Sequence, residues 1–354
     1  MKVNYYGMTD TGLVRQNNED AFVLQKIWDD NHILCVVIDG LGGYEGGEVA
    51  AEIAVSVITA FLSDNREGKA LELLKKAVTE ANNAVVSAKA DQPRLARMGC
   101  VLTACIIDLQ ARQLNVAHIG DTRLYRINGG CITKLTHDHA IVGYMEETGQ
   151  LTEEDAMNHP YRNVIERFLG EDRHLVDDPQ FIDAAIFPIT SGEALLLCSD
   201  GLSDMLTSAE ILNDVSPNCE ETVKDLIRDT NEKGGRDNVT VIAVAFTDPS
   251  IPISDSDISD EKTTHIRQEP SIREKVPLRS MLAKAWLPCL LSGLIMGYTA
   301  GNHNMAISIK VYEDSLTAVM NLADSLQSVI DNSIKTNDSI QDIPDYATAN
   351  ETQQ

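Results

Sequence analysis

The chain has 354 residues, enough for one large domain or two ordinary ones, and its composition of 43% hydrophobic and 23% charged residues is that of a folded protein. A formal net charge of −25 argues against nucleic acid as the main partner, because phosphate backbones are bound by Lys and Arg. The charge leaves phosphorylated protein substrates open, since bound metal ions reverse the sign of the field at a site.

Cysteine usage and the N-terminus point to a reducing compartment. The seven cysteines include no C-x-x-C pair, and Cys35, Cys105 and Cys198 lie in strand-like apolar runs. We therefore expect no structural disulfides. Residues 1–6 lack the apolar stretch of a secretory signal, so none is predicted.

Residues 1–247 have the pattern of a folded domain, in which short β-branched runs are bounded by turn residues. The predicted strands include residues 33–38, 101–107 and 239–246. The predicted helices cover residues 48–63, 71–89 and 220–233. Strands and helices gather in separate groups, which favours α+β layering over a doubly wound sheet.

The composition changes at Asp248, and residues 248–280 are predicted to be a disordered linker. The run 285–309 contains no charged side chain and follows four basic residues, Arg273, Lys275, Arg279 and Lys284. About 20 apolar residues span a bilayer, so residues 281–303 are predicted to form one transmembrane helix with its N-terminal side in the cytoplasm. The alternative is an apolar helix docked on the folded domain.

Small residues at Gly293, Gly297 and Gly301 have the spacing that lets transmembrane helices approach, which predicts a homodimer through this face. Residues 304–354 are predicted to form an amphipathic helix followed by a disordered tail.

Four short acidic patches carry most of the functional information. They are Arg15-Gln-Asn-Asn-Glu-Asp20, Val37-Ile-Asp-Gly-Leu-Gly-Gly43, Cys198-Ser-Asp-Gly201 and Gly234-Gly-Arg-Asp-Asn238. Each places a carboxylate at the end of an apolar run or beside glycine. Oxygen-only clusters of this kind suit hard divalent cations, and a pair of such cations activates water for attack on phosphorus. The patches therefore predict a metal-dependent phosphoester hydrolase.

Two of these carboxylates follow buried-strand runs directly. Asp39 follows residues 35–38 and Asp200 follows the run that ends at Cys198, and each is succeeded by glycine. An ionised carboxylate at such a place is costly unless it is solvated or bound to a cation. The alternative for each pair is an ordinary Asp-Gly turn.

The other acidic positions have simpler alternatives too. Glu19 and Asp20 would point to opposite faces of a strand, yet they serve one site if one binds metal and the other holds water; otherwise they form a solvated acidic turn. Asp237 precedes a strong β-run. The guanidinium of Arg15 matches phosphate oxygens, although a lone arginine is more often a surface residue.

Rival motifs are weak. The glycine-rich run after Asp39 fails the dinucleotide pattern, and there is no P-loop or nucleophile elbow. We interpret His118 as structural, because it lies within a strand-like run. His137 and His139 form a His-x-His fragment without a second ligand pair, which makes a zinc site unconvincing.

Taken together, the patches closely resemble the metal-dependent (type 2C) serine/threonine protein phosphatases of the bacterial kind over residues 1–247. The resemblance rests on Arg15-x-x-Asn18-Glu19-Asp20-Ala21, Asp39-Gly40-Leu41-Gly42-Gly43, Gly120-Asp121-Thr122-Arg123, Asp200-Gly201-Leu202 and Asp237-Asn238-Val239-Thr240. It implies a four-layer α/β/β/α sandwich of two antiparallel sheets flanked by helices.

The resemblance also implies a metal site for two Mn²⁺ or Mg²⁺ ions. Asp39 is expected to bridge both ions, with the Gly40 carbonyl on one of them, and Asp200 and Asp237 are expected to hold the other. With Asp200, Asp121 matches a third, weaker site.

Three further residues have implied roles around these ions. Glu19 and Asp20 are expected to act mainly through metal-bound water, with Asp20 orienting or deprotonating the nucleophile. Arg15 is expected to bind the substrate phosphate, and the reaction is expected to form no phosphoenzyme.

Two departures from the family pattern stand beside the implied site. Leu41 replaces the histidine that is proposed to protonate the leaving group in many relatives, so water must donate that proton. Cys100 stands in the common Gly-Thr-Thr motif, a change expected to alter packing more than chemistry. Residues 140–174 fall where the family carries its flap, a mobile segment that affects substrate choice.

We therefore expect a phosphoserine/phosphothreonine phosphatase that acts on targets of a Ser/Thr kinase, with a cytoplasmic catalytic domain anchored to the cell membrane by its C-terminal span. One alternative is a catalytically weak or silent phosphatase-fold scaffold that binds partners through its membrane and tail region. Another is a phosphatase for a small phosphorylated metabolite.

Carbonate extraction of membranes tests the predicted span. The full-length protein is expected to stay in the membrane pellet, because about 20 apolar residues are needed to cross the bilayer and residues 281–303 supply them. A variant that ends at residue 247 is the matched control and should be released. Recovery of the full-length protein wholly in the soluble fraction would show that the span is wrong.

Overall fold

The computed structural model describes residues 1–42, 46–91, 93–176 and 178–247, and strands in these ranges form two five-stranded antiparallel sheets. The first sheet has the order β1 (Lys2–Asp10), β10 (Val239–Thr247), β9 (Ala194–Cys198), β6 (Arg123–Asn128) and β7 (Cys131–Lys134). The second has the order β2 (Ala21–Ile27), β3 (His32–Leu41), β4 (Gly99–Asp108), β5 (Gln113–Ile119) and β8 (Asp183–Pro188).

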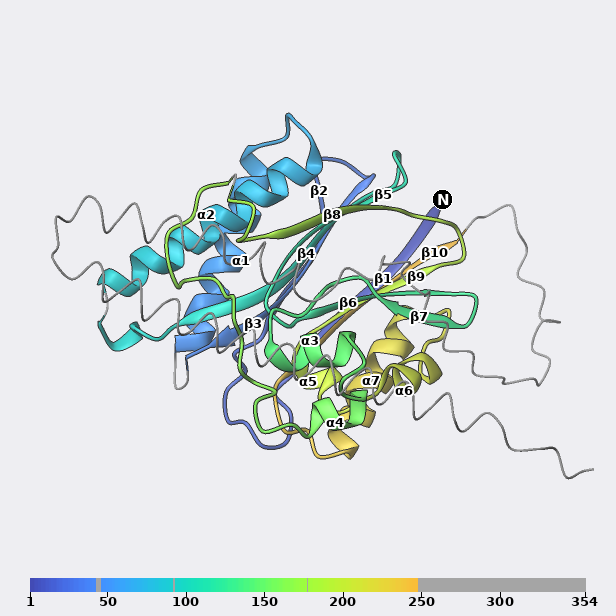
Figure 1. Ribbon diagram of the computed structural model, residues 1–354. Helices are drawn as coiled ribbons and strands as arrows, with labels where there is room; N and C mark the ends of the chain where they lie inside the picture. The colour runs from blue at the N-terminus through green and yellow to red at the C-terminus, as the bar shows by residue number, and fades with distance from the viewer. Residues whose placement is uncertain (43–45, 92, 177, 248–354) are drawn as a thin grey trace, which may run out of the picture. The chain divides into compact units, whose positions relative to one another are not determined.

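Helices cover the outer faces of both sheets (Figure 1). The helices α1 (Gly46–Asp64) and α2 (Ala70–Asp91) pack on the second sheet, and a short 3₁₀ helix (Pro93–Leu95) follows them. The first sheet is covered by α5 (Asp200–Ser203), α6 (Ser208–Asn213) and α7 (Cys219–Glu232). Between β7 and β8 lie α3 (Ile141–Glu147) and α4 (Glu153–Met157). The predicted α/β/β/α layering is confirmed.

Three layers of apolar side chains hold the sandwich together, and β3 shows how one strand serves two of them. Its side chains alternate, so Leu34 and Val36 pack under α1 and α2 while Ile33 and Cys35 face the other sheet. Both faces are therefore buried, which explains why the run is apolar without interruption. A third cluster lies between the first sheet and α5–α7.

The boundaries agree closely with the sequence-based expectations, with one exception. Each predicted helix is present and its ends move by only one or two residues. Glu19 and Asp20, however, precede β2 and lie in irregular chain, so the argument from alternating strand faces does not apply to them. The six cysteines of the described part form no disulfide bonds with one another.

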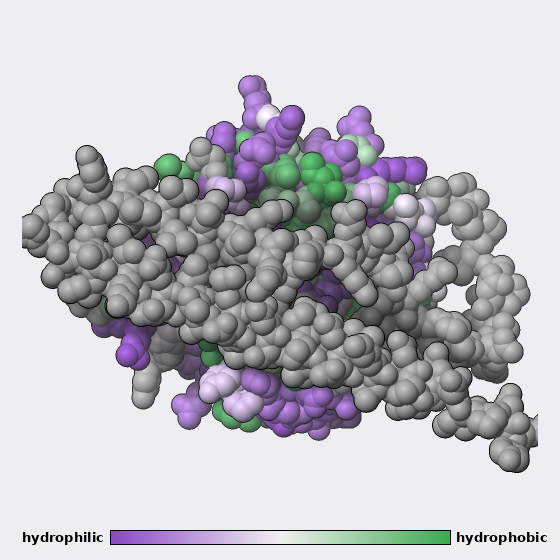
Figure 2. Space-filling view, in the orientation of Figure 1, coloured by the Kyte–Doolittle hydropathy of each residue, from purple (hydrophilic) through white to green (hydrophobic). Residues whose placement is uncertain are grey.

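One described helix, α1, has the length and mean hydropathy, 1.4, that a membrane-crossing helix needs. It is nevertheless packed on the second sheet, with Ala54, Ile58 and Leu62 buried. The predicted linker, span, dimer face and tail, residues 248–354, lie outside the described residues. Where Figure 2 leaves described residues visible, their surface is mainly hydrophilic.

Replacing Leu34 should weaken the fold more than any exposed change beside it. Leu34→Ala removes a fully buried side chain and leaves a cavity, which costs about 2–5 kcal/mol of unfolding free energy. Gln25 pairs with Leu34 across the β2–β3 ladder but is exposed, so Gln25→Ala is the matched control and should cost little. Urea unfolding followed by tryptophan fluorescence measures both. Equal losses would mean that this layer does not stabilise the sandwich.

Candidate active site

The predicted acidic residues come together at one edge of the sandwich. Neighbouring antiparallel strands reverse direction, so the end of one strand and the start of the next lie at the same edge. Asp39 is near the end of β3, Asp121 follows β5 and Asp200 follows β9, whereas Asp20 precedes β2 and Asp237 precedes β10. The two sheets thus contribute carboxylates to a common site.

Asp39 lies at the centre of this group. The residue is half-buried, and the loss of solvent around its carboxyl raises its pKa well above the usual range; Asp200, Asp20 and Asp121 raise the pKa further by charge repulsion. Asp39 is also hydrogen bonded to Asp200. Two ionised carboxylates repel each other at this distance, so the pair needs either a proton or a cation to compensate its charge.

Asp20 is held by two hydroxyl groups. Its Oδ2 accepts hydrogen bonds from Ser199 Oγ and Thr240 Oγ1, both 2.7 Å long, and Thr9 contacts Thr240 in turn. Burial raises the pKa of Asp20 to about 6, although both hydroxyls lower it. Sequence reasoning gave no role to Ser199 and Thr240, but Ser199 lies within an acidic patch and Thr240 within the motif Asp237–Thr240, one and three residues from a predicted ligand.

Asn238 fixes the acidic turn, a role that the sequence analysis also missed. Its Oδ1 accepts from the Glu19 backbone N–H at 2.8 Å. Its Nδ2 donates to the carbonyl oxygens of Thr11 and Asn17, each at 2.9 Å. One side chain from the start of β10 therefore holds the chain that leads into β2, and so brings the two sheets into register at the site.

Arg15 is paired with a predicted metal ligand. Its Nη2 lies 2.6 Å from Asp237 Oδ2, and the two side chains are 44% and 30% exposed. The backbone N–H groups of Leu13 and Val14 both donate to the Gly235 carbonyl, which holds this loop against the start of β10. The structure thus places Arg15 beside the acidic cluster, paired with Asp237.

Both Asp-Gly pairs require glycine for a steric reason. A Cβ on Gly40 would lie 2.4 Å from the Gly47 carbonyl and 2.6 Å from the Glu19 carbonyl oxygen. A Cβ on Gly201 would lie 1.9 Å from the Asn238 carbonyl oxygen. Backbone from another element therefore approaches each predicted ligand closely, which distinguishes these pairs from ordinary turns.

A small pocket of about 30 Å³ adjoins the cluster, lined by Asp121, Asp200, Asp204 and Arg123 among others. Burial raises the pKa of Asp121 well above its usual range, and repulsion by Asp200 and other carboxylates adds to this. Its Oδ1 is buried and has no hydrogen-bond partner within the described part of the chain. Burial and Asp200 also raise the pKa of Asp204, to about 7.

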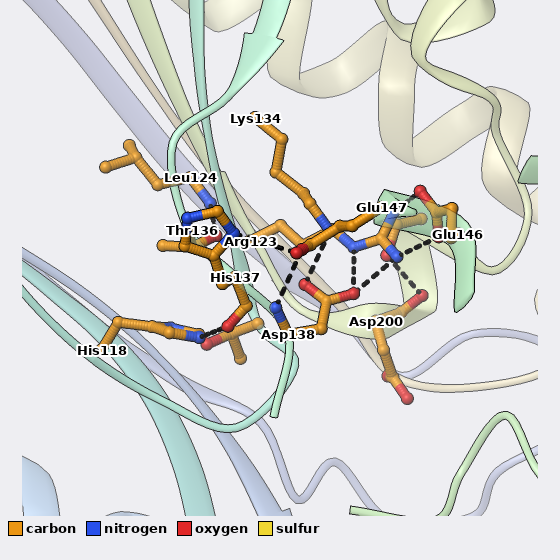
Figure 3. A network of polar contacts seen from close by, with 12 residues as sticks. His118, Arg123, Leu124, Lys134, Thr136, His137, Asp138, Glu146, Glu147 and Asp200 are labelled. Carbon is orange, nitrogen blue, oxygen red and sulfur yellow. Dashed lines mark hydrogen bonds and ion pairs between the residues drawn. The ribbon is translucent and has the colours of Figure 1, made fainter. Parts of the chain in front are cut away.

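An ion-pair network fixes α3, the first helix of the predicted flap, to the first sheet (Figure 3). Arg123 on β6 donates to Asp138 Oδ2 from Nε at 3.0 Å and from Nη2 at 2.7 Å, and to Glu146 Oε2 at 2.8 Å. Lys134 on β7 contacts Asp138 at 3.1 Å and Glu147 at 2.8 Å. The flap segment therefore begins with an anchored helix.

The two departures from the family pattern are also placed. Leu41 ends β3, half-buried, opposite Gly99 on β4. Cys100 is fully buried opposite Gly40, and its Sγ faces the Ala50 carbonyl on α1 at 3.9 Å. Its side chain thus contacts a helix beneath the site.

These residues fit a hard divalent cation, although the set is not closed. In the ranges that the structure describes, no three His, Cys, Asp or Glu side chains are already arranged to hold a metal ion. The available donors are nevertheless oxygen atoms, several carboxylates repel one another strongly, and Asp121 Oδ1 has no partner. A cation would relieve the repulsion and occupy the free oxygen. The sequence analysis did not assign His118 and His137 to a metal site. His118 is buried and hydrogen bonded to the protein, and His137 is exposed.

Known proteins with this arrangement are phosphatases. The family model described as protein phosphatase 2C matches residues 14–238. A serine/threonine phosphatase of Listeria monocytogenes is 34% identical over 243 residues, which cover 67% of this chain and 93% of the relative. Protein phosphatase PhpP of Streptococcus pneumoniae is 32% identical over 247 residues, 68% of this chain and 96% of the relative.

Solved structures agree. The Mycobacterium tuberculosis serine/threonine phosphatase PstP superimposes with a TM-score of 0.61 at 33% identity, over 70% of this chain and 99% of that one. A second structure, the PstP catalytic domain in complex with two manganese ions, gives a TM-score of 0.59 at 31% identity, over 70% of this chain and 99% of that one. The chain spans 45% of the full-length curated PstP sequence.

The fold and site define a phosphatase of the four-layer sandwich class. The chain belongs to the protein phosphatase 2C family, and the expectation that it is an enzyme of the serine/threonine phosphatase type is confirmed.

Charge repulsion in the cluster predicts an unusual effect of pH on the protein in EDTA. The raised pKa values mean that ionisation of Asp20 and Asp200, both near pH 6, opposes folding, so their contribution to stability is present below about pH 4 and is lost as pH rises through 6. Asp39→Asn removes one buried charge. It should raise the thermal midpoint at pH 7.5, and the difference should shrink towards pH 4.

Thermal melting in EDTA across this pH range measures the effect, and 1 kcal/mol corresponds to about 2–4 °C for a domain of this size. Asp30→Asn is the control, because the Asp30 side chain is 91% exposed. A midpoint for Asp39→Asn equal to or below that of the unaltered protein at pH 7.5 would contradict the repulsion.

Proposed function

We propose that this protein hydrolyses phosphoserine and phosphothreonine in other proteins, with two bound Mn²⁺ or Mg²⁺ ions and without a phosphoenzyme. The observation that carries the proposal is the buried cluster of carboxylates at one edge of the sandwich, with Arg15 beside it. The names of the relatives and the two manganese ions of the PstP catalytic domain support it.

The proposed ligands are those that the family resemblance implies. Asp39 would contact both ions, the Gly40 carbonyl would contact one of them, and Asp200 and Asp237 would hold the other. Asp121, with its unpartnered Oδ1, would share a third and weaker position with Asp200. When bound, such ions supply the positive charge that polarises a phosphoryl group and lowers the pKa of water.

The side chains of the protein orient the attack. Asp20 has Oδ2 occupied by Ser199 and Thr240, which leaves Oδ1 to position a water molecule or take its proton. Glu19 would act beside it through water. Arg15 would bind the phosphate by turning from Asp237 or by bridging both groups, since its fork offers several donors.

The two cysteines beside the described site are poor candidates for a covalent nucleophile. Burial raises the pKa of Cys100 and Cys198 to about 12, so neither thiol ionises near neutral pH. The Ser199 hydroxyl donates a hydrogen bond to Asp20. Leu41 offers no proton to the leaving group, so water would protonate it.

The cellular setting is also a proposal. The substrates would be phosphoproteins made by a Ser/Thr kinase, and the catalytic domain would face the cytoplasm while residues 281–303 anchor it to the cell membrane. The apolar run and the basic residues before it support this. A homodimer through Gly293, Gly297 and Gly301 would form in the membrane.

Hydrolysis of a phosphothreonine peptide by the full-length protein tests the activity. Turnover is expected with Mn²⁺ and not with EDTA, and Asp39→Asn should lose it by at least about 100-fold, because the ligand shared by both ions is removed. Asp30→Asn is the matched control and should keep full activity, since its side chain is exposed.

The alternatives predict other outcomes. Full activity of Asp39→Asn would refute the metal assignment. Metal binding without turnover of any phosphorylated compound would favour a silent scaffold. Turnover of a small phosphate ester but not of phosphopeptides would favour a metabolite phosphatase.

A further inference from the structure

His139, which the sequence analysis discounted as a zinc ligand, contacts the turn before Asp121 in two ways. Its backbone N–H donates to the Gly120 carbonyl at 2.7 Å. The Gly120 N–H donates back to His139 Nδ1 at 3.0 Å. The residue immediately before Asp121 is therefore held by both backbone and side chain of His139, which is only 5% exposed.

The orientation of the His139 ring is fixed by its surroundings. Because Nδ1 accepts a hydrogen bond, the proton of the neutral ring lies on Nε2, which faces Asp183 Oδ2 at 3.2 Å without good hydrogen-bond alignment. The ring of His118 packs against it, with centroids 5.0 Å apart. His118 is itself bonded through Nε2 to the His137 carbonyl, drawn in Figure 3, and through Nδ1 to Thr103.

The turn that His139 holds has no freedom to adopt another shape. Gly120 has φ of +105°, a conformation that favours glycine, and a Cβ there would lie 2.2 Å from Val101 Cβ. On the far side of Asp121, the Thr122 hydroxyl and carbonyl contact Thr103 Oγ1 at 2.8 and 3.1 Å. Both neighbours of Asp121 are thus fixed, which restricts the backbone from which its carboxylate projects.

His139 also joins this turn to the flap segment. Its carbonyl accepts from the Glu166 N–H at 2.7 Å, and Ala140 forms a β-bridge with Ile165. Leu169, three residues after Glu166, exchanges backbone hydrogen bonds with Cys100. Cys100 in turn pairs with Gly40 in the β3–β4 ladder. The returning end of the flap is therefore tied to the site at two points, and His139 supplies the one nearer Asp121.

We propose that His139 is a positioning residue: through its paired hydrogen bonds with Gly120 it sets the place of the Asp121 carboxylate and couples it to the flap. The effect on cation binding rests on the proposed function, in which Asp121 shares the weaker metal position. Groups that orient a metal ligand typically change metal affinity about 10–100-fold when they are removed.

Two substitutions at His139 separate positioning from simple packing. In His139→Asn the amide Oδ1 falls near the place of Nδ1 and keeps an acceptor for Gly120. In His139→Gln the polar end falls near the place of Nε2, so that acceptor is lost. His137→Gln is the matched control, because the His137 side chain lies two residues away and is 76% exposed.

Residue-resolved hydrogen exchange and calorimetric titration with Mn²⁺ on the full-length variants are the readouts. We expect His139→Gln to speed exchange of the Gly120 amide and to weaken the weakest Mn²⁺ binding step about 10–100-fold, with the tighter steps retained. His139→Asn and His137→Gln should resemble the unaltered protein.

Unchanged Gly120 exchange and Mn²⁺ binding in His139→Gln, or equal losses in His139→Asn, would overturn the proposal. If the unaltered protein binds no Mn²⁺ at all, the proposed function fails, and Gly120 exchange alone decides the role of His139. If neither His139 variant folds, hydrogen exchange in the unaltered protein tests the role of His139. The Gly120 and Glu166 amides should then be protected alike, and fast exchange at Gly120 would refute the paired hydrogen bonds.

Discussion

Repulsion among buried carboxylates is the constraint on which the architecture of the site depends. Asp39, Asp20, Asp200 and Asp121 are brought together in surroundings that raise the pKa of each one. Such an arrangement costs free energy unless protons or cations compensate it. The arrangement persists because the packed sandwich holds the strand ends in place even when the carboxylates repel one another. Folded proteins support other strained functional sites in the same way.

The polar residues around the carboxylates fix the positions of the acidic side chains and so prepare them to bind a cation. Ser199 and Thr240 hold one oxygen of Asp20, and Asn238 holds the turn that carries Glu19. His139 holds the turn before Asp121. These contacts leave some carboxylate oxygens free and fix their directions, so a cation meets donors that are already oriented and little ordering is needed when it binds.

The flap segment differs from a simple mobile loop. Its first helix is anchored by Arg123 and Lys134, and its returning end is bonded to His139 and Cys100. The stretch between these anchors contains exposed apolar side chains, among them Tyr161 and Val164. Both ends of this segment are therefore tied to the elements that carry Asp121 and Gly40.

The amino-acid sequence by itself determined the helices and the α+β class, because hydrophobic periodicity is a local signal, whereas the four-layer sandwich and the acidic site residues were expected from the resemblance of its motifs to a known family. It did not reveal Ser199, Thr240, Asn238 or His139 as supporting residues, nor that Arg15 pairs with Asp237. Those roles depend on contacts between segments up to 231 residues apart, and only the packing of two antiparallel sheets brings such segments together. No local sequence pattern predicts the distant hydrogen-bond partner of a short polar side chain. The tertiary structure alone therefore decided which of these side chains hold the site.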